Sequence, residues 1–468
     1  MNPDRRRFLR NVGLASAGVV GASILPLRGQ SSGPSAAHGG TQDFNMCGYG
    51  APPLERVRIA ILGLGMRGSQ ALRRLRHIEQ VDVVALCDVR QEQLDKALSQ
   101  LNASGPHPDV YSGSEDAWKR ACDRDDVDLV YICTPWALHA PMAVYAMEQG
   151  KHAAVEVPAA QSIEECWQLV ETSERTRRHC MMLENCCYDF FELLTLSLAR
   201  AGFFGEIVHC EGAYIHNLID LNFNRTGYDR MWRLEENSRR NGNLYPTHGL
   251  GPIAQVMNVN RGDRFDFLVS VSTADFSMNV HAKELAEKDP FFAAYVDRPY
   301  RGNMNTTTIR THHGRTIMLQ HDVSSPRPYS RIHLVSGTRA MARKWPRPGR
   351  ISVGENWLDE TEMKTLEEQH TPELVRRVGD LAKQIGGHGG MDFIMDWRLI
   401  DCLRNGRPLD QDVYDAASWS AIGMLSEQSV AARSSAVDVP DFTRGAWQQN
   451  APVNLSLDGV GTTRVRGA

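Results

Sequence analysis

The segment Gly63–Gly68 constrains the fold of this chain more than any other, because it reads Gly-Leu-Gly-Met-Arg-Gly between a predicted strand and a predicted helix. The apolar run Val57–Leu62 predicts the strand, and the amphipathic run Arg67–His77 predicts the helix. A second predicted strand, Val81–Leu86, leads to Asp88, twenty positions after the last glycine. A glycine-rich turn between a strand and a helix, followed by a second strand that leads to an acid, is typical of an α/β unit that binds a dinucleotide.

Each part of this segment has a physical role in such a unit. Gly63, Gly65 and Gly68 allow a tight turn and a close approach of the backbone to a pyrophosphate, whose charge the helix N-terminus stabilises. Asp88 would accept hydrogen bonds from the adenosine ribose and repel a 2′-phosphate, which favours NAD over NADP. Arg90 leaves NADP as an alternative, because its charge could bind that phosphate. A glycine turn capped by an aspartate, with no ligand, is the structural alternative.

Length and charge limit what the chain can be. At 468 residues it is long enough for two domains, each with its own core, and we expect a cleft between them. Lys and Arg number 52 and Asp and Glu number 56, which gives a formal net charge of -4. This balance lacks the basic excess of a polyanion-binding protein, so we expect no nucleic-acid partner.

The N-terminal segment, residues 1–53, predicts export. Arg5-Arg6-Arg7-Phe8-Leu9 stands before the apolar run Val12–Leu25, which is too short and too rich in glycine and alanine to span a bilayer. We interpret it as a twin-arginine signal, which predicts a periplasmic or cell-envelope protein with no membrane span in the mature chain. A basic N-terminus with a short membrane-associated helix is the alternative. Residues 30–53 are rich in Gly, Ser and Pro, and we expect a disordered linker there.

The pattern of apolar runs predicts an α/β protein with two folded domains. From residue 54 to 184, strands alternate with helices, which predicts a doubly wound parallel sheet of the Rossmann type. Residues 185–440 predict an α+β domain with an open antiparallel sheet, whose last helices return to the first domain. Residues 441–468 are expected to form a C-terminal tail. The expected strands of the second domain are Glu206–Tyr214, Arg264–Ser272, Thr306–Arg310, Thr316–Val323 and Arg331–Val335.

The ten cysteines are scattered through predicted strands and helices, with no C-x-x-C spacing. Without such spacing, the sequence indicates neither a disulfide framework nor a metal site. We expect the cysteines to be buried as small hydrophobic residues, and we expect no disulfide between the adjacent Cys186 and Cys187.

Two further loops are expected beside the cofactor, because open parallel sheets bind ligands at the carboxyl ends of their strands. The segment Thr134–His139, which reads Thr-Pro-Trp-Ala-Leu-His, follows the predicted strand Leu129–Cys133. Glu156–Pro158 follows the next predicted strand. Trp136 and His139 could instead pack at the start of the following helix.

These residues resemble the glucose-fructose oxidoreductase and inositol dehydrogenase superfamily, which pairs an NAD(P) domain with an open-sheet domain that carries the substrate pocket. The usual motif of that superfamily is Glu-Lys-Pro, whose lysine assists hydride transfer. Here the motif reads Glu156-Val157-Pro158. This departure argues against a standard sugar dehydrogenase.

Within that superfamily, the chain is similar to the NAD-dependent α-N-acetylgalactosaminidases of glycoside hydrolase family 109. Similar segments span most of the chain from Val57 to about Ser420, and valine at position 157 is usual in this group. The most specific of them are Tyr245-Pro-Thr-His-Gly, Pro326-Arg-Pro-Tyr-Ser and His388-Gly-Gly-Met-Asp-Phe.

The resemblance implies a glycosidase that uses tightly bound NAD in place of two catalytic carboxylates. NAD would take hydride from carbon 3 of the sugar, a side-chain base would remove the proton on carbon 2, and the anomeric group would leave by elimination. Water would then add and the hydride would return, so that no net oxidation occurs. The implied substrate is a terminal α-N-acetylgalactosamine on a small carbohydrate or glycoconjugate. Other sugars, the other anomer and a homo-oligomeric state are all compatible with the sequence.

The same resemblance implies which residues form the site. Its NAD contacts correspond to Met66, Arg67, Asp88, Trp136, Ala137, Leu138, His139, Glu156, Val157, Asn185 and Tyr245. Its substrate contacts correspond to Tyr214, Arg233, Tyr245, Pro246, Thr247, His248 and Tyr329.

Three residues are candidates for acid-base catalysis. Tyr188 is the candidate base for the carbon 2 proton, or else a buried tyrosine that only packs. His248 begins an apparent helix and could accept the proton of the carbon 3 hydroxyl, or else act as a capping or core histidine. Tyr245, in the same motif as His248, is the third candidate. Arg233 could be a structural ion-pair partner instead of a substrate contact.

Two other functions are compatible with the sequence. A sugar or inositol dehydrogenase that consumes soluble NAD would share the fold, and it would accumulate NADH with free sugar. A sugar-binding protein without turnover would explain the missing lysine, and it would bind a ligand without forming any product.

Overall fold

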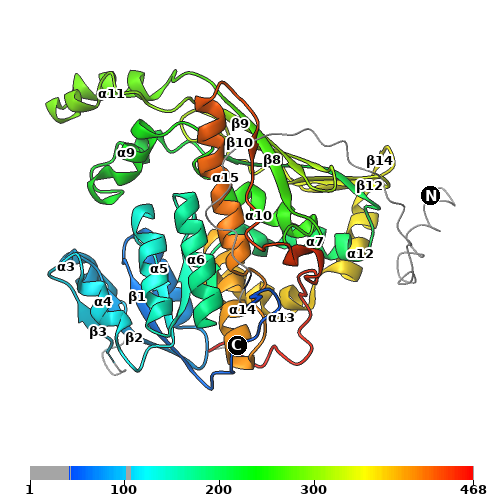
Figure 1. Cartoon of the computed structure of the whole chain (residues 1–468), viewed down its shortest axis with the longest axis horizontal. Helices are drawn as coiled ribbons and strands as arrows, with labels where there is room; N and C mark the ends of the chain where they lie inside the picture. Colours follow the sequence, from blue (N-terminus) through cyan, green and yellow to red (C-terminus); the bar gives the residue numbers. More distant parts are fainter. Residues whose placement is uncertain (1–41, 43, 102–106, 467–468) are drawn as a thin grey trace.

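The computed structural model of the chain describes residues 42, 44–101 and 107–466. The expected twin-arginine segment lies outside these residues. Two sheets organise the described chain, the first within residues 57–182 and the second within residues 207–438 (Figure 1).

The first sheet is parallel and six-stranded, in the order β3-β2-β1-β4-β5-β6. Because the order reverses between β1 and β4, the carboxyl ends of these two strands form the switch point where such sheets bind ligands. This is the doubly wound arrangement predicted from the sequence. The strands are β1 Val57–Leu62, β2 Val81–Cys87, β3 Asp109–Tyr111, β4 Leu129–Ile132, β5 His152–Val155 and β6 Cys180–Met182. The helices are α2 Met66–Leu75, α3 Gln91–Ser99, α4 Ala117–Cys122, α5 His139–Glu148 and α6 Ile163–Thr176.

Burial explains why the central strands form. Every residue of β4 and β5 is buried. Continuous apolar runs such as Leu129–Ile132 are typical of parallel strands that helices cover on both faces. The predicted cap of α6 is also present, because the hydroxyl of Ser162 accepts the backbone N–H of Glu165 at 3.0 Å.

The second sheet is nine-stranded, in the order β14-β13-β12-β11-β7-β10-β9-β8-β15. Among its described strands, only β7 and β10 pair in parallel, with Tyr214 opposite His321. The sheet is therefore mixed and mostly antiparallel, where we had expected an antiparallel one. The parallel pair arises because a long crossover, residues 216–315, separates the two strands. The strands are β7 Ile207–Ile215, β8 Phe265–Ser272, β9 Asn305–Thr311, β10 Thr316–Asp322, β11 Leu334–Gly337, β12 Ala340–Arg343, β13 Arg350–Val353, β14 Asn356–Trp357 and β15 Val437–Asp438.

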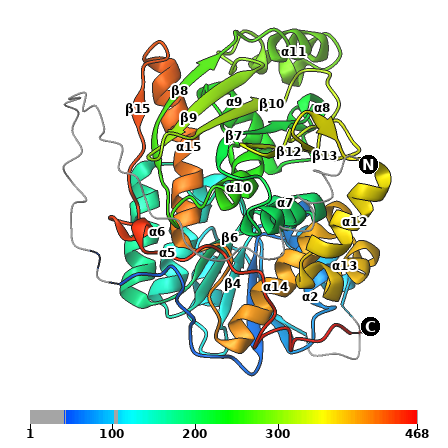
Figure 2. The same cartoon turned by 90° about the vertical axis from the view of Figure 1, so that its right-hand side faces the viewer.

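Helices of the second half join the two sheets. α15 packs against both α6 and β8, and α14 packs against α2 (Figure 2). Trp397 on α14 and Trp419 on α15 have no exposed surface, so the junction is part of the core. The α-helices are α7 Phe190–Arg200, α8 Ile219–Asn222, α9 Trp232–Arg239, α10 Thr247–Val256, α11 Met278–Ala286, α12 Glu360–His370, α13 Glu373–Ile385, α14 Met391–Asn405 and α15 Val413–Ala431. Short 3-10 helices are η1 Trp136–Leu138, η2 Asn185–Tyr188, η3 Asp229–Met231, η4 Pro290–Tyr295, η5 His388–Gly390 and η6 Ala446–Gln448.

Both ends of the described chain are packed. The expectation of a disordered linker up to residue 53 is wrong for residues 44–53, since Met46 is 2% exposed and its backbone N–H donates to the Tyr414 hydroxyl at 3.1 Å. At the other end, the backbone N–H of Arg466 donates to the His77 carbonyl at 2.7 Å. The composition of residues 44–53 therefore did not predict their state, because long-range contacts order these residues.

All ten cysteines lie within the described residues, and none of them is paired in a disulfide. Eight of the ten are buried, as expected for small hydrophobic residues. Over the part of the chain that the structure describes, no helix combines the length and the apolar character needed to cross a bilayer.

Candidate functional site

The glycine turn Gly63–Gly68 has the geometry that an approaching pyrophosphate requires. Gly63 has a φ of +84°, and a side chain there would meet the Cys133 carbonyl oxygen at 2.7 Å. A side chain at Gly68 would collide with the Gly63 carbonyl. A side chain at Gly65 would meet no described atom within 4 Å. The space beside Gly65 is therefore open to a ligand at the N-terminus of α2, where free N–H groups favour an anion.

Asp88 follows β2 and supports this turn. Its Oδ2 accepts the backbone N–H of Leu64 at 2.7 Å, and its Oδ1 accepts that of Arg90 at 2.9 Å. The Arg90 guanidinium lies 3.8 Å from Asp88 and 3.6 Å from Asp229 of the second domain. Because these carboxylates offset the charge of Arg90, little of it is left to attract a 2′-phosphate. The residues present therefore fit NAD better than NADP.

His139 holds the loop at the end of β4 to the segment after β5. It is 1% exposed, and its ring nitrogens lie 2.7 Å from the Pro158 carbonyl oxygen and 2.8 Å from that of Thr134. Burial lowers the pKa of His139. These contacts favour the packing alternative for His139 over direct contact with a cofactor.

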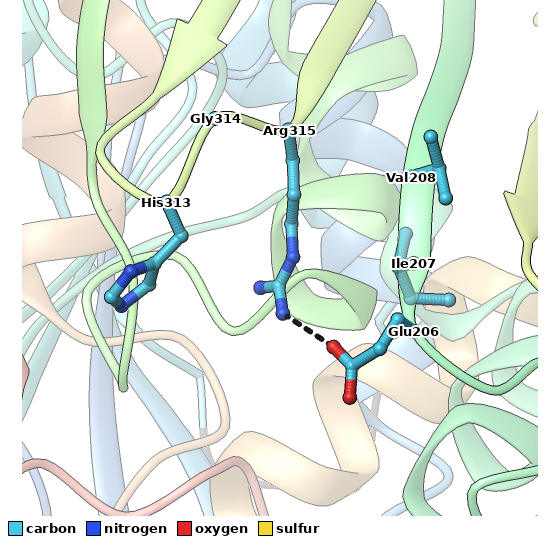
Figure 3. Close-up of a pocket in the computed structure, with 6 residues that line it drawn as sticks. All are labelled: Glu206, Ile207, Val208, His313, Gly314 and Arg315. Carbon is cyan, nitrogen blue, oxygen red and sulfur yellow. Dashed lines mark hydrogen bonds and ion pairs between the residues drawn. The ribbon is translucent and has the colours of Figure 1, made fainter. Parts of the chain in front are cut away.

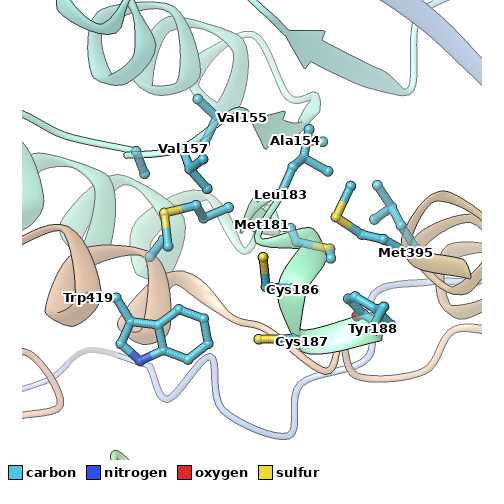
Figure 4. Packing of buried hydrophobic residues seen from close by; sticks show 14 of the residues in the cluster. Ala154, Val155, Val157, Met181, Leu183, Cys186, Cys187, Tyr188, Met395 and Trp419 are labelled. Carbon is cyan, nitrogen blue, oxygen red and sulfur yellow. The ribbon is translucent and has the colours of Figure 1, made fainter. Parts of the chain in front are cut away.

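Four other predicted cofactor residues divide into two groups. Met66, Ala137 and Leu138 are exposed around the carboxyl ends of β1 and β4, where a ligand could reach them. Val157 is 3% exposed and belongs to the hydrophobic core behind the site (Figure 4). Its side chain therefore packs against protein.

Arg67, in the first turn of α2, is bonded directly to Glu156 and is linked to Asn185 through Asp392. Glu156 and Asn185 are also predicted NAD contacts. Its Nε donates to Glu156 at 2.7 Å, and its Nη1 donates to Asp392 at 3.1 Å. The side-chain amide of Asn185 donates to the other oxygen of Asp392. Arg67 and Asn185 are thus held by one carboxylate at the start of α14, and Glu156 joins them through Arg67.

Asp392 is a functional candidate that the sequence analysis missed, although it lies in the His-Gly-Gly-Met-Asp-Phe motif. Its side chain is fully buried, 3.4 Å from Arg74 and 2.9 Å from His388. Burial would raise the pKa of Asp392, but Arg67, His388 and Arg74 hold it well below its usual value. Asp392 is therefore an ionised carboxylate that ties α2 of the first domain to α14.

An aromatic cluster, Trp136, Tyr214, Arg233 and Tyr245, forms where the two domains meet. The ring of Tyr245 stacks on that of Trp136 with centroids 5.8 Å apart and lies 4.7 Å from that of Tyr214. The guanidinium of Arg233 lies 5.2 Å from the Trp136 ring and 4.8 Å from the Tyr245 ring. Such a cluster offers apolar ring faces together with charged hydrogen-bond donors.

Arg233 forms hydrogen bonds but no ion pair among the described residues. Its Nη1 donates to the Tyr228 hydroxyl at 3.0 Å. Within the described residues, no carboxylate forms an ion pair with Arg233. The ion-pair alternative for Arg233 therefore has no partner among the described residues, and no carboxylate offsets the charge of the guanidinium.

His248, the second residue of α10, is paired with Glu184, which follows β6. Its Nδ1 lies 2.8 Å from Oε1 and 3.0 Å from Oε2 of the carboxylate. Glu184 is fully buried, and its Oε1 also accepts the backbone N–H of Cys186 at 3.0 Å. The His248 ring lies 5.3 Å from that of Tyr214 and 4.9 Å from that of Tyr245. The sequence analysis predicted His248 and missed Glu184.

The other predicted substrate residues lie around the aromatic cluster. Pro246 is buried just before α10. Thr247 is fully buried at the first position of α10. Tyr329 packs edge-on against Tyr214, with centroids 6.3 Å apart, and against His216 at 5.0 Å.

Tyr188 does not join this group. It is 1% exposed, and its hydroxyl donates to Asp410 at 3.3 Å, beside the Arg398 guanidinium that Asp410 also binds. Figure 4 shows its ring among buried apolar side chains. Burial raises the pKa of Tyr188 well above its usual value, and its hydroxyl is directed to Asp410 and not to the aromatic cluster. This placement favours the packing alternative for Tyr188.

Side-chain atoms of Glu184, Cys186 and His248 lie within 4.8 Å of one another, which is close enough to share a metal ion. Burial raises the pKa of the Cys186 thiol well above its usual value, so the thiol is a poor ligand. The hydrogen bonds to Glu184 already account for the approach of His248. We therefore interpret the group as a hydrogen-bonded cluster.

A surface hollow of about 530 Å³ lies at the opposite end of β7 from Tyr214 (Figure 3). The ion pair between Arg315 and Glu206, at 3.5 Å, crosses one side of it. At about 3.3 Å per residue, seven residues of strand separate Ile207 from Tyr214 by roughly 23 Å. The hollow is therefore separate from the candidate site. Its lining residues are Glu206, Ile207, Val208, His313, Gly314 and Arg315.

Solved structures share this two-domain fold at low sequence identity. A levoglucosan dehydrogenase in complex with NADH and L-sorbose is 18% identical, with a TM-score of 0.62 over 83% of this chain and 100% of that one. An aldose-aldose oxidoreductase from Caulobacter crescentus is 17% identical, with a TM-score of 0.59 over 82% of this chain and 100% of that one. At such identities the likeness concerns the fold.

Comparison with family models and relatives is more specific. Residues 57–184 match the NAD-binding Rossmann fold of an oxidoreductase family, and residues 188–449 match the C-terminal domain of glycosyl hydrolase 109. An α-N-acetylgalactosaminidase of Bacteroides fragilis is 49% identical over 86% of this chain and 96% of its own length. One of Shewanella oneidensis is 44% identical over 97% of this chain and 99% of its own length. The chain therefore belongs to glycosyl hydrolase family 109, with a Rossmann domain for which NAD is the cofactor.

Proposed function

We propose that this protein is a glycosidase that releases terminal α-N-acetylgalactosamine with the help of tightly bound NAD. The proposal rests on one observation: a turn that fits a dinucleotide and the aromatic cluster lie at the same edge of the first sheet. The open glycine turn with Asp88 fits a dinucleotide, and Trp136, in the loop after β4, stacks on Tyr245 of the second domain. Relatives that match nearly the whole chain carry the α-N-acetylgalactosaminidase name, which supports this choice of sugar.

Bound NAD supplies a reversible hydride acceptor, so that a sugar carbon can be oxidised and then restored within one turnover. The chain would hold it with the glycine turn, with Asp88 at the ribose, and with Met66, Ala137 and Leu138 at the surface of the loops. Asp392 fixes Arg67 and Asn185, and Arg67 fixes Glu156, so the three would present a rigid set of polar groups.

The acid-base steps are assigned to groups in the aromatic cluster and next to it. His248 accepts the proton of the sugar hydroxyl at the carbon that is oxidised, and it returns this proton at the end. Tyr245 is the proposed base for the proton on the neighbouring carbon. Burial raises the pKa of Tyr245, and the guanidinium of Arg233 opposes part of that effect. Arg233, Tyr214 and Tyr329 would bind the remaining sugar hydroxyls or the acetamido group.

The experiment uses the purified full chain with its co-purified nucleotide and an aryl α-N-acetylgalactosaminide. We expect many molecules of aryl alcohol released per bound NAD, with no accumulation of NADH. A protein that retains NAD and releases no aryl group would contradict the proposal. NADH formed in proportion to free sugar would support the dehydrogenase alternative, and a thermal shift without product would support the binding-protein alternative. A panel of other aryl glycosides tests the choice of sugar and anomer.

We also propose export by the twin-arginine route, because a protein carried in the folded state can leave the cytoplasm already loaded with NAD. The support is the Arg5-Arg6-Arg7-Phe8-Leu9 sequence alone. Replacing Arg5 and Arg6 by lysine should move the protein from the periplasmic fraction to the cytoplasmic one. Equal distribution of both forms would contradict export by this route. A homo-oligomer through the second sheet is a further proposal, which the mass from light scattering tests.

A further inference from the structure

Glu184 is placed so that it can act only through His248. The carboxylate follows β6 and is fully buried, whereas His248 retains 13% side-chain exposure at the start of α10. Gly251, one turn further along α10, gives the carboxylate room, because a side chain there would lie 2.8 Å from Cγ of Glu184. The start of α10, the end of β6 and the absence of a side chain at Gly251 together place the Glu184 carboxylate beside the His248 imidazole.

The charge state of Glu184 determines the tautomer of His248. Burial would raise the pKa of Glu184, but the interaction with His248, the Thr247 hydroxyl and the N–H of Cys186 outweigh it and lower the pKa. An ionised carboxylate can only accept hydrogen bonds, so Nδ1 of His248 must carry a hydrogen. Nε2 is then the nitrogen with a lone pair, and it makes no hydrogen bond to any described residue.

No other acid is bonded to this imidazole in the described part of the chain. Burial raises the pKa values of Cys186 and Tyr214, so these two neighbours stay neutral. The N-terminus of α10 disfavours a positive imidazole, because the helix dipole is positive there. Glu184 is the group that offsets this effect. The titratable or charged groups that face His248 are Glu184, Cys186, Tyr214, His216, Arg233 and Tyr245.

We infer that Glu184 is a positioning residue for the proposed reaction, which holds hydrogen on Nδ1 of His248 and directs the lone pair of Nε2 toward the sugar hydroxyl. This inference rests on the proposed function. The proton of that hydroxyl moves to Nε2, the resulting imidazolium is stabilised by the carboxylate, and the same proton returns when the hydroxyl is restored. Glu184 itself neither gains nor loses a proton. The arrangement follows the logic of histidine–carboxylate pairs in hydrolases.

The first test is Glu184→Gln in the full chain with its bound nucleotide. We expect kcat to fall roughly 100- to 10,000-fold, because a neutral amide no longer fixes the tautomer or stabilises the imidazolium. KM should change little. The acid limb of the kcat/KM profile should move to lower pH, since the neutral amide no longer stabilises a positive charge beside it. An unchanged kcat with an unmoved acid limb would overturn the inference.

Two further variants separate positioning from folding. Glu184→Asp keeps the charge and should retain more activity than Glu184→Gln, with an acid limb near that of the original protein. Asp401→Asn removes another fully buried carboxylate, which caps backbone N–H groups of Gly461 and Thr463 away from the site, and it should leave the pH profile unmoved. A shifted profile in Asp401→Asn, or equal losses in both Glu184 variants, would favour a merely structural role.

The second test does not depend on activity. In protein labelled with ¹⁵N-histidine, NMR should show His248 in the tautomer with hydrogen on Nδ1, identified by the signal that His248→Gln removes. Glu184→Gln should convert it to a mixture of tautomers. Hydrogen on Nε2 in the unsubstituted protein would overturn the inference even if the aryl glycoside is hydrolysed. The expected NMR result without any aryl release would instead contradict only the proposed function.

Discussion

The carboxylate of Asp392 lies 3.1 Å from the guanidinium of Arg67, although 325 positions of sequence separate the two residues. Arg67 belongs to the helix that starts at the glycine turn, and Asp392 begins the helix that returns from the second domain. Asn185, between the two domains, is held by the same carboxylate. One buried acid therefore sets the relative positions of several predicted NAD contacts.

Asp392→Asn should destabilise the fold by about 3 kcal/mol, because it removes the partner of a buried, paired guanidinium. It should also increase the loss of bound nucleotide during gel filtration. Urea denaturation and the absorbance of the released nucleotide measure these two effects. The matched control is Asp380→Asn on the neighbouring helix α13, whose carboxylate is 96% exposed and which should change stability by less than about 0.5 kcal/mol. Equal behaviour of the two variants would contradict this account.

Stability should depend on pH through two buried carboxylates. Asp189, just before α7, lies 2.6 Å from both Arg331 and Lys344. Burial would raise the pKa values of Asp392 and Asp189, but the cations beside each carboxylate hold these values below the usual range. A folded pKa below the unfolded value gives stability that is complete above about pH 4 to 5 and is lost as the pH falls toward the folded pKa. Thermal denaturation should show Tm falling from pH 5 to pH 3, less steeply in Asp392→Asn. An identical slope would show that Asp392 does not carry this effect.

Two glycine substitutions should separate cofactor binding from folding. Gly65→Ala places a methyl group in open space, so the free energy of unfolding should change by less than about 1 kcal/mol while nucleotide occupancy falls. Gly68→Ala forces a contact with the Gly63 carbonyl, so it should cost about 2 kcal/mol or more and reduce occupancy as well. Full nucleotide occupancy in Gly65→Ala would mean that the ligand does not approach there.

Tyr188→Phe should leave kcat within about threefold and reduce stability by about 1 kcal/mol, which is the usual cost of one lost hydrogen bond. The reason is that the hydroxyl lies in the core against Asp410. Tyr245→Phe, compared in the same assay, should lower kcat far more. A large loss of kcat in Tyr188→Phe with unchanged stability would restore Tyr188 as the candidate base.

The sequence predicted what depends on local pattern. The glycine turn, Asp88 and the alternation of strands and helices were found because neighbouring residues define them. Tyr245 and His248 were predicted through a short specific motif, and the structure places their rings 4.9 Å apart. The fold of the first domain needed no more than these patterns.

Residues that act across long distances in sequence were not predicted. Glu184 lies 64 positions from His248, and nothing in its own segment indicates that partner. Asp392 lies in a motif that we recognised, but its role depends on α14 packing against α2. The roles of His139 and Tyr188 were left between two alternatives, because burial, which favours packing for both, is a property of the folded chain.

The central claim is that the glycosidic bond breaks by elimination, after a proton has been removed from carbon 2 of the sugar while NAD is bound. The most direct measurement is mass spectrometry and NMR of N-acetylgalactosamine released from an aryl α-glycoside in D₂O. The account predicts one deuterium bound to carbon 2 of the released sugar, because the proton removed there is replaced from solvent. Released sugar with only exchangeable deuterium, and none on carbon 2, would contradict it.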